Sequence, residues 1–299
     1  MASREVGRVL RFDSRTCIVV VEETKKRYSC VLPGKFRTQG IRPIAGDIVE
    51  FAPLGSSDGI VRAIRNRKNE LSRPKVANID QVILVTSMKH PRVPLNIVDR
   101  FLVLTEREGI ETIIVVNKVD LLEDCAELGA FEGIYGRLYT VLKVSAKTGK
   151  NLCTLQRVFQ GKVSAVAGMS GVGKSSILNA LNPGLGLRVA EISKKLERGK
   201  HTTSAMELLE FSFGGYVADT PGFASLDLKD IGFAELKKYF PEMKNIHESC
   251  AFNDCLHYQE PDCSVRKMVE SGELSASRYE SYKSMLVELR DQDSFRNRR

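Results

Sequence analysis

The segment Gly168-Met169-Ser170-Gly171-Val172-Gly173-Lys174-Ser175 constrains the fold more than any other stretch, because it fits the phosphate-binding pattern G-x-x-x-x-G-K-[ST]. An apolar run at 163–167 precedes it and helical spacing at 176–181 follows it. Strand, glycine loop and helix is the context in which backbone N–H groups turn inward around phosphate oxygens. A chance glycine-rich turn is the alternative, and the correct flanks make it the weaker interpretation.

Two side chains of this loop have expected roles in a nucleotide site. The Lys174 ammonium should reach the β- and γ-phosphates, and the Ser175 hydroxyl should hold Mg²⁺. Upstream of the loop, apolar strand patterns at 80–87, 111–116 and 138–144 alternate with helical periodicity, notably at 95–108. This alternation predicts a parallel α/β sheet.

A guanine-selective motif, Asn117-Lys118-Val119-Asp120, follows the buried strand at 111–116 and fits N-K-x-D. The Asp120 carboxylate can accept from both N1–H and the exocyclic amine of guanine, whereas adenine offers neither donor there. Lys118 can lay its stem across the base, and Asn117 can tie the loop to the phosphate side. Four residues alone could also be a plain turn. The strand before them and the P-loop in the same chain favour the guanine site.

A second short motif, Ser145-Ala146-Lys147, stands at the end of the strand at 138–144. It matches the backbone-donating motif that completes a guanine pocket, although by itself it would carry no weight.

Two segments downstream of the P-loop have the pattern of nucleotide switches. In Arg198-Gly199-Lys200-His201-Thr202-Thr203, either Thr202 or Thr203 could close over Mg²⁺ and the γ-phosphate, and the spacing does not choose between them. Strand patterns at 206–211 and 216–218 then lead into Asp219-Thr220-Pro221-Gly222. There Asp219 should reach Mg²⁺ through water and the Gly222 N–H should sense the γ-phosphate.

The order of these motifs is the informative feature. An ordinary GTPase runs P-loop, switch threonine, D-x-x-G, N-K-x-D and S-A-K, whereas here the last two come first. A sheet whose original termini lie close together can be joined there and cut elsewhere without changing its fold. The cut falls just after D-x-x-G, so the second switch leads directly into the C-terminal tail.

The first quarter of the chain is basic and rich in strand patterns. Residues 1–75 contain 16 Lys and Arg against 8 Asp and Glu, which accounts for the whole net charge of +8. Such a region suggests a polyanion partner, nucleic acid first, although a merely solvated surface is the alternative. Five β patterns predict a small barrel of the OB type: 6–12, 17–23, 28–32, 47–52 and 59–64.

The longest barrel loop, 33–45, carries the candidate RNA contacts Lys35, Phe36, Arg37 and Arg42. Cations interleaved with an aromatic ring suit a nucleic-acid backbone with a stacked base. Phe36 could equally plug the end of the barrel, and the cations do not depend on that choice.

The tail contains Cys250-x₄-Cys255-x-His257-x₅-Cys263, which fits a closed tetrahedral zinc site. Helical patterns surround it at 232–240, 264–271 and 277–290, and a helical module of about 70 residues needs such a staple. Loose structural cysteines with a surface histidine are the alternative. Seven scattered cysteines fit a reducing cytosol. We also expect no export, because the N-terminus has no apolar signal core, and no membrane contact.

These features predict a multi-domain chain, as 299 residues exceed one ordinary core. The expected parts are an RNA-binding OB-type β-barrel at 1–70, a circularly permuted α/β P-loop GTPase domain at 71–228 and a helical zinc-binding domain at 229–299. A polar linker at 65–74 separates the first two.

With this motif order, the barrel in front and the cysteine–histidine cluster behind, the chain closely resembles the bacterial circularly permuted, ribosome-small-subunit-dependent GTPases, over essentially its whole length. The resemblance implies GTP hydrolysis stimulated by the small ribosomal subunit and a role in late maturation of that subunit. It implies guanine contacts from N-K-x-D, phosphate and Mg²⁺ contacts from Gly168 through Ser176, and zinc ligands at the cysteine–histidine cluster. The expected partners are the subunit and its rRNA, and we expect a monomer in the cytoplasm.

The catalytic residues are less fixed. Many GTPases orient the attacking water with a glutamine just after D-x-x-G, but Phe223 stands there and cannot do so. His201 is the candidate within the chain, alongside Lys174 and Thr203, although His201 could instead hydrogen-bond the switch backbone. The residue before this histidine is usually arginine in the family. Lys200 keeps the charge but loses bidentate geometry, which puts any specific phosphate contact there in doubt.

A competing hypothesis from another class makes the protein mainly an RNA-binding assembly module for which GTP is a regulatory ligand. The intact P-loop, Ser175 and Asp219 favour the hydrolase. GTP turnover with and without small subunits separates the two.

Overall fold

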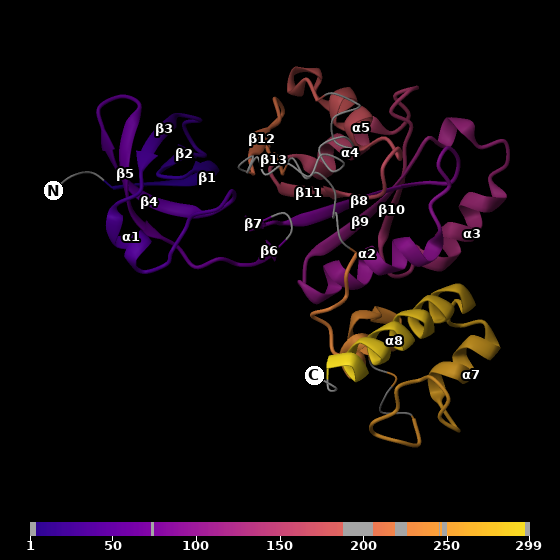
Figure 1. Ribbon diagram of the computed structural model, residues 1–299. Coiled ribbons are helices and arrows are strands. Elements are labelled where there is room, and N and C mark those ends of the chain that lie inside the picture. Colours follow the sequence, from indigo (N-terminus) through magenta and orange to yellow (C-terminus); the bar gives the residue numbers. More distant parts are fainter. Residues whose placement is uncertain are drawn as a thin grey trace.

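The computed structural model describes residues 4–72, 75–187, 206–218, 226–244, 246 and 250–296. Figure 1 shows a β-barrel at one end, a central sheet flanked by helices, and a helical module below that sheet. This arrangement confirms the predicted fold class.

The N-terminal barrel is closed in the strand order β1-β2-β3-β5-β4. The bounds are β1 (Glu5–Asp13), β2 (Thr16–Val20), β3 (Arg27–Val31), β4 (Ile48–Leu54) and β5 (Asp58–Ile64). Inward-facing positions alternate along each strand, as in Val9, Val19 and Phe51, all fully buried. Among the described strands of this barrel, β3 and β5 pair in parallel and the other neighbours pair antiparallel.

A short helix, α1 (Gly34–Thr38), lies in the segment expected to be a loop. It turns Phe36 into the barrel core, where the side chain is only 6% exposed. A ring covered in this way has no free face for a base. Of the two roles left open for Phe36, this burial favours the ring as a plug at the barrel end.

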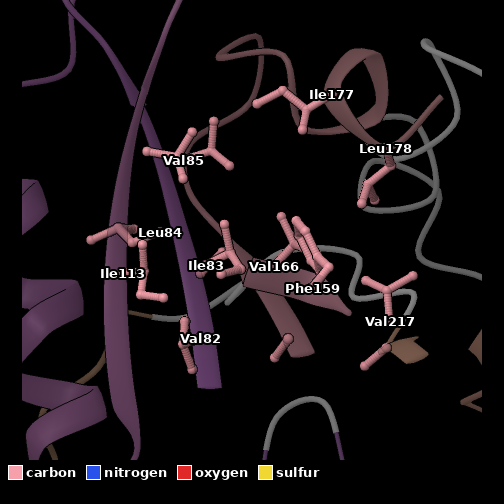
Figure 2. Close-up of a cluster of buried hydrophobic side chains, with 14 of the residues drawn as sticks. Val82, Ile83, Leu84, Val85, Ile113, Phe159, Val166, Ile177, Leu178 and Val217 are labelled. Carbon is pink, nitrogen blue, oxygen red and sulfur yellow. The ribbon is translucent and has the colours of Figure 1, made fainter. Parts of the chain in front are cut away.

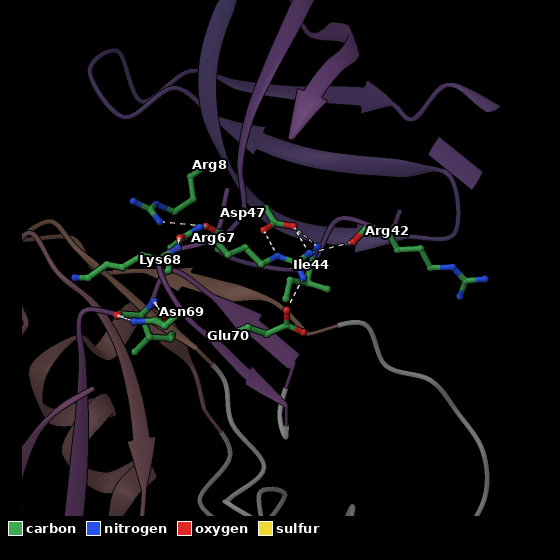
Figure 3. Close-up of polar contacts among 11 residues, drawn as sticks. Arg8, Arg42, Ile44, Asp47, Arg67, Lys68, Asn69 and Glu70 are labelled. Atoms are coloured by element: carbon green, nitrogen blue, oxygen red, sulfur yellow. Dashed lines mark hydrogen bonds and ion pairs between the residues drawn. The ribbon is translucent and has the colours of Figure 1, made fainter. Parts of the chain in front are cut away.

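The connection between barrel and sheet is ordered rather than a plain linker. Arg67 donates to both carboxylate oxygens of the fully buried Asp47, at 2.7 and 2.9 Å, and to Glu70 at 2.5 Å. Figure 3 shows this ion-paired cluster between the two domains. A two-stranded hairpin follows, formed by β6 (Glu70–Ser72) and β7 (Lys75–Ala77). The polar composition of this segment predicted a linker, because composition does not show that Arg67 forms an ion pair with Asp47, which lies 20 residues earlier in the sequence.

The central sheet has the order β10-β9-β8-β11-β13-β12, and only β12 runs antiparallel to its neighbour. The bounds are β8 (Gln81–Ser87), β9 (Glu111–Asn117), β10 (Thr140–Lys143), β11 (Val163–Ala167), β12 (Leu208–Glu210) and β13 (Tyr216–Ala218). All side chains of β8 and β11 are buried, as expected for a parallel sheet covered on both faces. Figure 2 shows part of this core, with Phe159 and Ile177 packing on β8 and β11 side chains.

Helices cover both faces of the sheet (Figure 1). They are α2 (Leu95–Arg107), α3 (Ala126–Tyr135), α4 (Leu152–Phe159) and α5 (Lys174–Leu181), with single 3₁₀ turns η1 (Val119–Leu121) and η2 (Pro183–Leu185). Both α3 and α4 are additional to the sequence expectation.

The C-terminal module contains η3 (Phe233–Tyr239), η4 (Pro241–Met243), α7 (Ser264–Ser271) and α8 (Ala276–Arg296). The predicted helix at 232–240 is a 3₁₀ helix. The module's core includes Val103 and Leu104 of α2, so the module packs directly on the central α/β domain.

Candidate functional site: a guanine nucleotide site and a metal centre

The P-loop connects β11 to α5, and glycines are required at two of its positions. Gly168 has φ +134°, and a Cβ there would lie 2.1 Å from the Val85 carbonyl oxygen. Gly173 has φ +98°, and a Cβ there would lie 2.3 Å from the Asn117 side-chain nitrogen. Both approaches are shorter than any real side chain tolerates, so the loop can pass this close to β8 and the guanine motif only with glycine.

The P-loop lysine is held inside this loop. Its ammonium donates to the carbonyl oxygens of Gly168 and Met169, each at 2.7 Å, and the side chain is 8% exposed. Burial lowers the pKa of Lys174 to about 8. A phosphate placed within the loop would favour the charged amine and raise that pKa again.

One amide joins the three nucleotide motifs. The Asn117 side-chain nitrogen donates to the Val172 carbonyl at 2.9 Å, which is the tie to the phosphate loop that the sequence suggested. Its side-chain oxygen accepts the Ala146 N–H at 3.2 Å. Asn117 is 2% exposed, at the end of β9. The P-loop, N-K-x-D and S-A-K therefore meet at the carboxyl edge of the sheet despite their rotated order.

The other two guanine-motif side chains are also oriented. Ser145 donates to one carboxylate oxygen of Asp120 at 2.5 Å, and the same hydroxyl accepts the Thr148 N–H at 3.1 Å. The second Asp120 oxygen and the remaining lone pairs suit the two adjacent donors of guanine. Lys118 takes a left-handed backbone conformation with φ 63°.

The loop at 88–94 is a part of this site that sequence reasoning missed. The Lys118 ammonium donates to the carbonyl of His90 as well as to that of Gly171, the latter at 2.7 Å. A side chain at Gly171 would meet Pro91 at 3.3 Å. The loop thus packs against both nucleotide motifs, and no motif could have signalled it because the acceptor is a backbone carbonyl that every residue has.

Several expected site residues lie outside the described residues. These are His201, Thr202, Thr203, Asp219 and Gly222. On the barrel, Lys35 and Arg42 are exposed, and the Arg37 side chain lies outside what is described.

The tail brings Cys250, Cys255, His257 and Cys263 together, with all four ligand atoms within 4.8 Å of one another. The His257 Nδ1 lies 3.6 Å from the first sulfur and 3.4 Å from each of the other two. Zinc bonds of about 2.3 Å to sulfur and 2.0 Å to nitrogen, in a tetrahedron, put sulfur and nitrogen about 3.5 Å apart. The donor set and its spacing therefore fit zinc.

A carboxylate supports the ligand loop from outside the cluster. Glu260 accepts the backbone N–H groups of Leu256, Tyr258 and Gln259 at 2.9, 2.8 and 3.0 Å. Burial alone would raise the pKa of Glu260, but these hydrogen bonds outweigh it and lower the pKa. The sequence analysis missed Glu260, and its position between His257 and Cys263 is the feature that could have pointed to it.

Comparison with known proteins agrees with this architecture. The family described as RsgA GTPase matches residues 64–229, and the RsgA N-terminal domain matches residues 7–61. A protein named small ribosomal subunit biogenesis GTPase RsgA, from Thermotoga neapolitana, is 50% identical over 97% of this chain and 98% of its own length. One of the same name from a Geobacillus species is 46% identical over 89% and 92%.

Solved structures show the same fold. The crystal structure of YjeQ from Thermotoga maritima has a TM-score of 0.87 and 46% identity, covering 96% of this chain and 99% of that one. The structure of YloQ, described as a circularly permuted GTPase, has a TM-score of 0.84 and 36% identity, covering 97% and 96%. This chain therefore belongs to the RsgA GTPase family, whose members hydrolyse GTP to GDP and phosphate.

Proposed function

We propose that this GTPase binds the small ribosomal subunit and assists its late maturation, that the subunit stimulates hydrolysis, and that hydrolysis times release. The observation that carries the nucleotide half is the Asn117 amide, which holds the P-loop and S-A-K together in a guanine-binding geometry. The ribosomal half is supported by the names of the relatives and by the basic barrel, which suits rRNA.

Within this proposal each motif has a role. N-K-x-D and Ser145-Ala146-Lys147 bind guanine, and Gly168 through Ser176 bind the phosphates, with Lys174 on the β- and γ-phosphates. Mg²⁺ would be held by Ser175, by Asp219 through water, and by Thr202 or Thr203. Zinc would be held by Cys250, Cys255, His257 and Cys263, where it supplies a structural cross-link.

The attacking water needs a group other than the residue after D-x-x-G, because Phe223 has no polar atom to orient it. His201 is the candidate within the chain, and a group of the subunit is the other. In either case slow intrinsic turnover and strong stimulation follow.

The deciding measurement is GTP turnover by the full chain with and without purified small subunits. Faster turnover with subunits supports the proposal. Equal turnover, together with nucleotide-dependent binding to the subunit, would instead support an RNA-binding module for which GTP is a regulatory ligand.

We propose that the protein works as a monomer in the cytoplasm, without a membrane. In the described part of the chain, the helices are too short or too polar to cross a bilayer. Sedimentation of the purified protein tests the oligomeric state.

Replacing Asp120 with asparagine should weaken GDP binding about ten- to a hundredfold, because a buried guanine donor loses its acceptor. The same variant should bind xanthosine diphosphate better than wild type does. Xanthine has a carbonyl where guanine has its amine, and the asparagine NH₂ can donate to it. Isothermal titration calorimetry with GDP and with xanthosine diphosphate measures both affinities in the variant and in wild type.

The matched control is Asp124→Asn, an exposed carboxylate in the segment just after the motif. It should leave both affinities unchanged. Unaltered GDP affinity in Asp120→Asn would refute the guanine assignment.

GDP affinity should fall about tenfold between about pH 7 and about pH 9, because burial lowers the pKa of Lys174 to about 8 in the free protein. Bound phosphate raises that pKa, so binding takes up a proton only above pH 8. Below that value the amine is already charged and affinity is flat. Lys174→Arg removes this titration, and its GDP affinity should change less over the same range. Equal slopes for the two proteins would contradict this prediction.

Removing the exposed charges Lys35 and Arg42 together should weaken small-subunit binding. The slope of log affinity against log salt should fall by about 0.7 to 0.9 per charge removed, because each phosphate contact releases a counterion. Arg157→Ala, an exposed charge on α4, is the control. An unchanged slope in the double variant would show that the barrel charge serves solubility alone.

A further inference from the structure

The edge of the central sheet carries both strands that border the switch segments. In the chain, β12 follows the segment with Thr202 and Thr203, and β13 leads into Asp219. The two strands pair antiparallel, with Glu210 directly opposite Tyr216. A force on this residue pair therefore acts on the strands next to both switch segments.

The barrel contacts this pair through a cluster of cations. Lys25 lies 3.0 Å from one Glu210 carboxylate oxygen, and Arg27 lies 3.0 Å from the other. The Lys25 ammonium also donates to the Tyr216 hydroxyl at 3.4 Å and lies 5.3 Å from its ring centroid. The Arg8 guanidinium lies 6.0 Å from the same ring. Figure 1 shows the barrel strands facing β12 and β13.

The carboxylate at the centre of this contact is mostly covered. The Glu210 side chain is 19% exposed although its two partners are about half exposed. Burial alone would raise the pKa of Glu210, but the hydrogen bonds from Lys25 and Arg27 outweigh it and lower the pKa, so the carboxylate is charged. Leu10 and Val20 of the barrel are buried in the same hydrophobic cluster as the sheet, which seats the barrel beside this edge.

We propose that the Glu210–Tyr216 pair is a point through which the barrel acts on the switch-bearing edge of the sheet, which the barrel also contacts through the Arg11–Glu207 ion pair at 3.6 Å. Lys25, Arg27 and Glu210 are then positioning residues for subunit-stimulated hydrolysis. The inference rests on the proposed function, because it requires a subunit that binds the barrel. When the subunit reorients the barrel, the two cations shift Glu210, and the paired strands carry that shift toward both switch segments.

The test separates stimulation from binding and from intrinsic turnover. Glu210→Gln removes the charge but keeps the shape. The variant's stimulation factor, which is turnover with subunits divided by turnover without, should fall about three- to tenfold. Intrinsic turnover, GDP affinity and subunit affinity should stay within about twofold of wild type. A contact that served stability alone would lower all four quantities together, or it would leave all four unchanged, the stimulation factor included.

The control and the rescue use the chain's own ion pairs. Glu50→Gln breaks the Arg65–Glu50 pair within the barrel, 3.2 Å apart, and should leave the stimulation factor unchanged. The double variant Lys25→Glu, Arg27→Glu should lower the factor as Glu210→Gln does, and adding Glu210→Arg to it should restore most of the loss, because the arginine then faces two carboxylates. This exchange keeps the inference testable if one single variant folds poorly.

Three results have different meanings. If wild type is stimulated and Glu210→Gln is stimulated equally, the inference is wrong and the proposed function stands. If the loss of the Lys25→Glu, Arg27→Glu variant persists after Glu210→Arg is added, ion pairing is not the link and the inference also fails. Absence of stimulation in wild type would overturn the proposed function itself.

Discussion

Replacing Cys255 with serine should abolish the proposed zinc binding and unfold the C-terminal module while GDP binding stays within about twofold of wild type. In small zinc domains the metal contributes about 10–16 kcal/mol to folding, more than the total stability of a typical domain. The three sulfurs surround His257 Nδ1 at 3.4–3.6 Å, so each ligand is needed to complete the tetrahedron. Metal analysis and hydrogen exchange over the module measure the two effects.

The physical reason for a local effect is the position of the cluster. Its ligands hold the loop between η4 and α7, and Tyr279 of α8 donates to the His257 carbonyl at 2.9 Å. If the cluster holds zinc as proposed, loss of the metal would remove this support of α7 and α8. The P-loop lies between β11 and α5, and neither of these elements contributes to the module's core.

A matched control is Cys153→Ser, an exposed cysteine on α4 outside the cluster. It should keep its zinc and its protection against exchange. Wild-type protein purified without chelator and found to contain no zinc would rule out the metal centre. Zinc loss without any change in exchange would show that the module folds independently of the metal.

Two short strands and one helix were predicted from the sequence with the bounds that the structure gives them. The patterns at Val163–Ala167, Tyr216–Ala218 and Ser264–Ser271 have the same bounds in the structure. By contrast, α3 was not predicted, and its Gly129 and Gly133 lower its intrinsic helix propensity. Its helical state is decided by packing against the sheet, which no local pattern reports.

The nucleotide motifs were predictable because their chemistry fixes residue types at fixed spacings. Their support was not predictable, because it comes from groups without a signature. The His90 carbonyl that accepts from Lys118 is one example. The Asp47–Arg67 pair between barrel and linker is another, since 20 residues separate its members. A charged residue inside an apolar helical pattern can indicate a buried ion pair. Asp99 is such a residue, because it lies between Val98 and Phe101 in the predicted helix.

Asp99 belongs to a buried ionic cluster between the GTPase domain and the C-terminal module. Arg278 of α8 is 1% exposed and donates to Asp99 of α2 at 2.8 Å. It also donates to both carboxylate oxygens of Glu242, at 2.7 and 2.9 Å. The Tyr135 hydroxyl donates to Asp99 at 2.7 Å. One guanidinium thus compensates two carboxylates, so its removal would leave both without their cation.

Replacing Arg278 with methionine should therefore cost about 3–5 kcal/mol of stability. In thermal unfolding of the full chain, the midpoint should fall by about 6 °C or more. Lys283→Met is the control on the same helix. Its ion pair with Glu280 is partly exposed, with side chains 30% and 69% accessible, and its loss should cost less than about 1 kcal/mol.

The pH dependence identifies the mechanism of this loss. Burial raises the pKa of Asp99 even though Arg278 and the hydrogen-bonded hydroxyls oppose the shift. Without the arginine the folded-state pKa should rise further above its unfolded value. The folded protein then binds more protons than the unfolded chain, so stability increases as pH falls. The deficit of Arg278→Met relative to wild type should shrink as the pH is lowered from neutral, and adding Asp99→Asn should recover part of it at neutral pH. The stability deficit could instead be independent of pH and unrelieved by Asp99→Asn. That result would show that the buried charge is not responsible and that the loss comes from the packing of Arg278 on Phe240, whose ring centroid lies 4.8 Å from the guanidinium carbon.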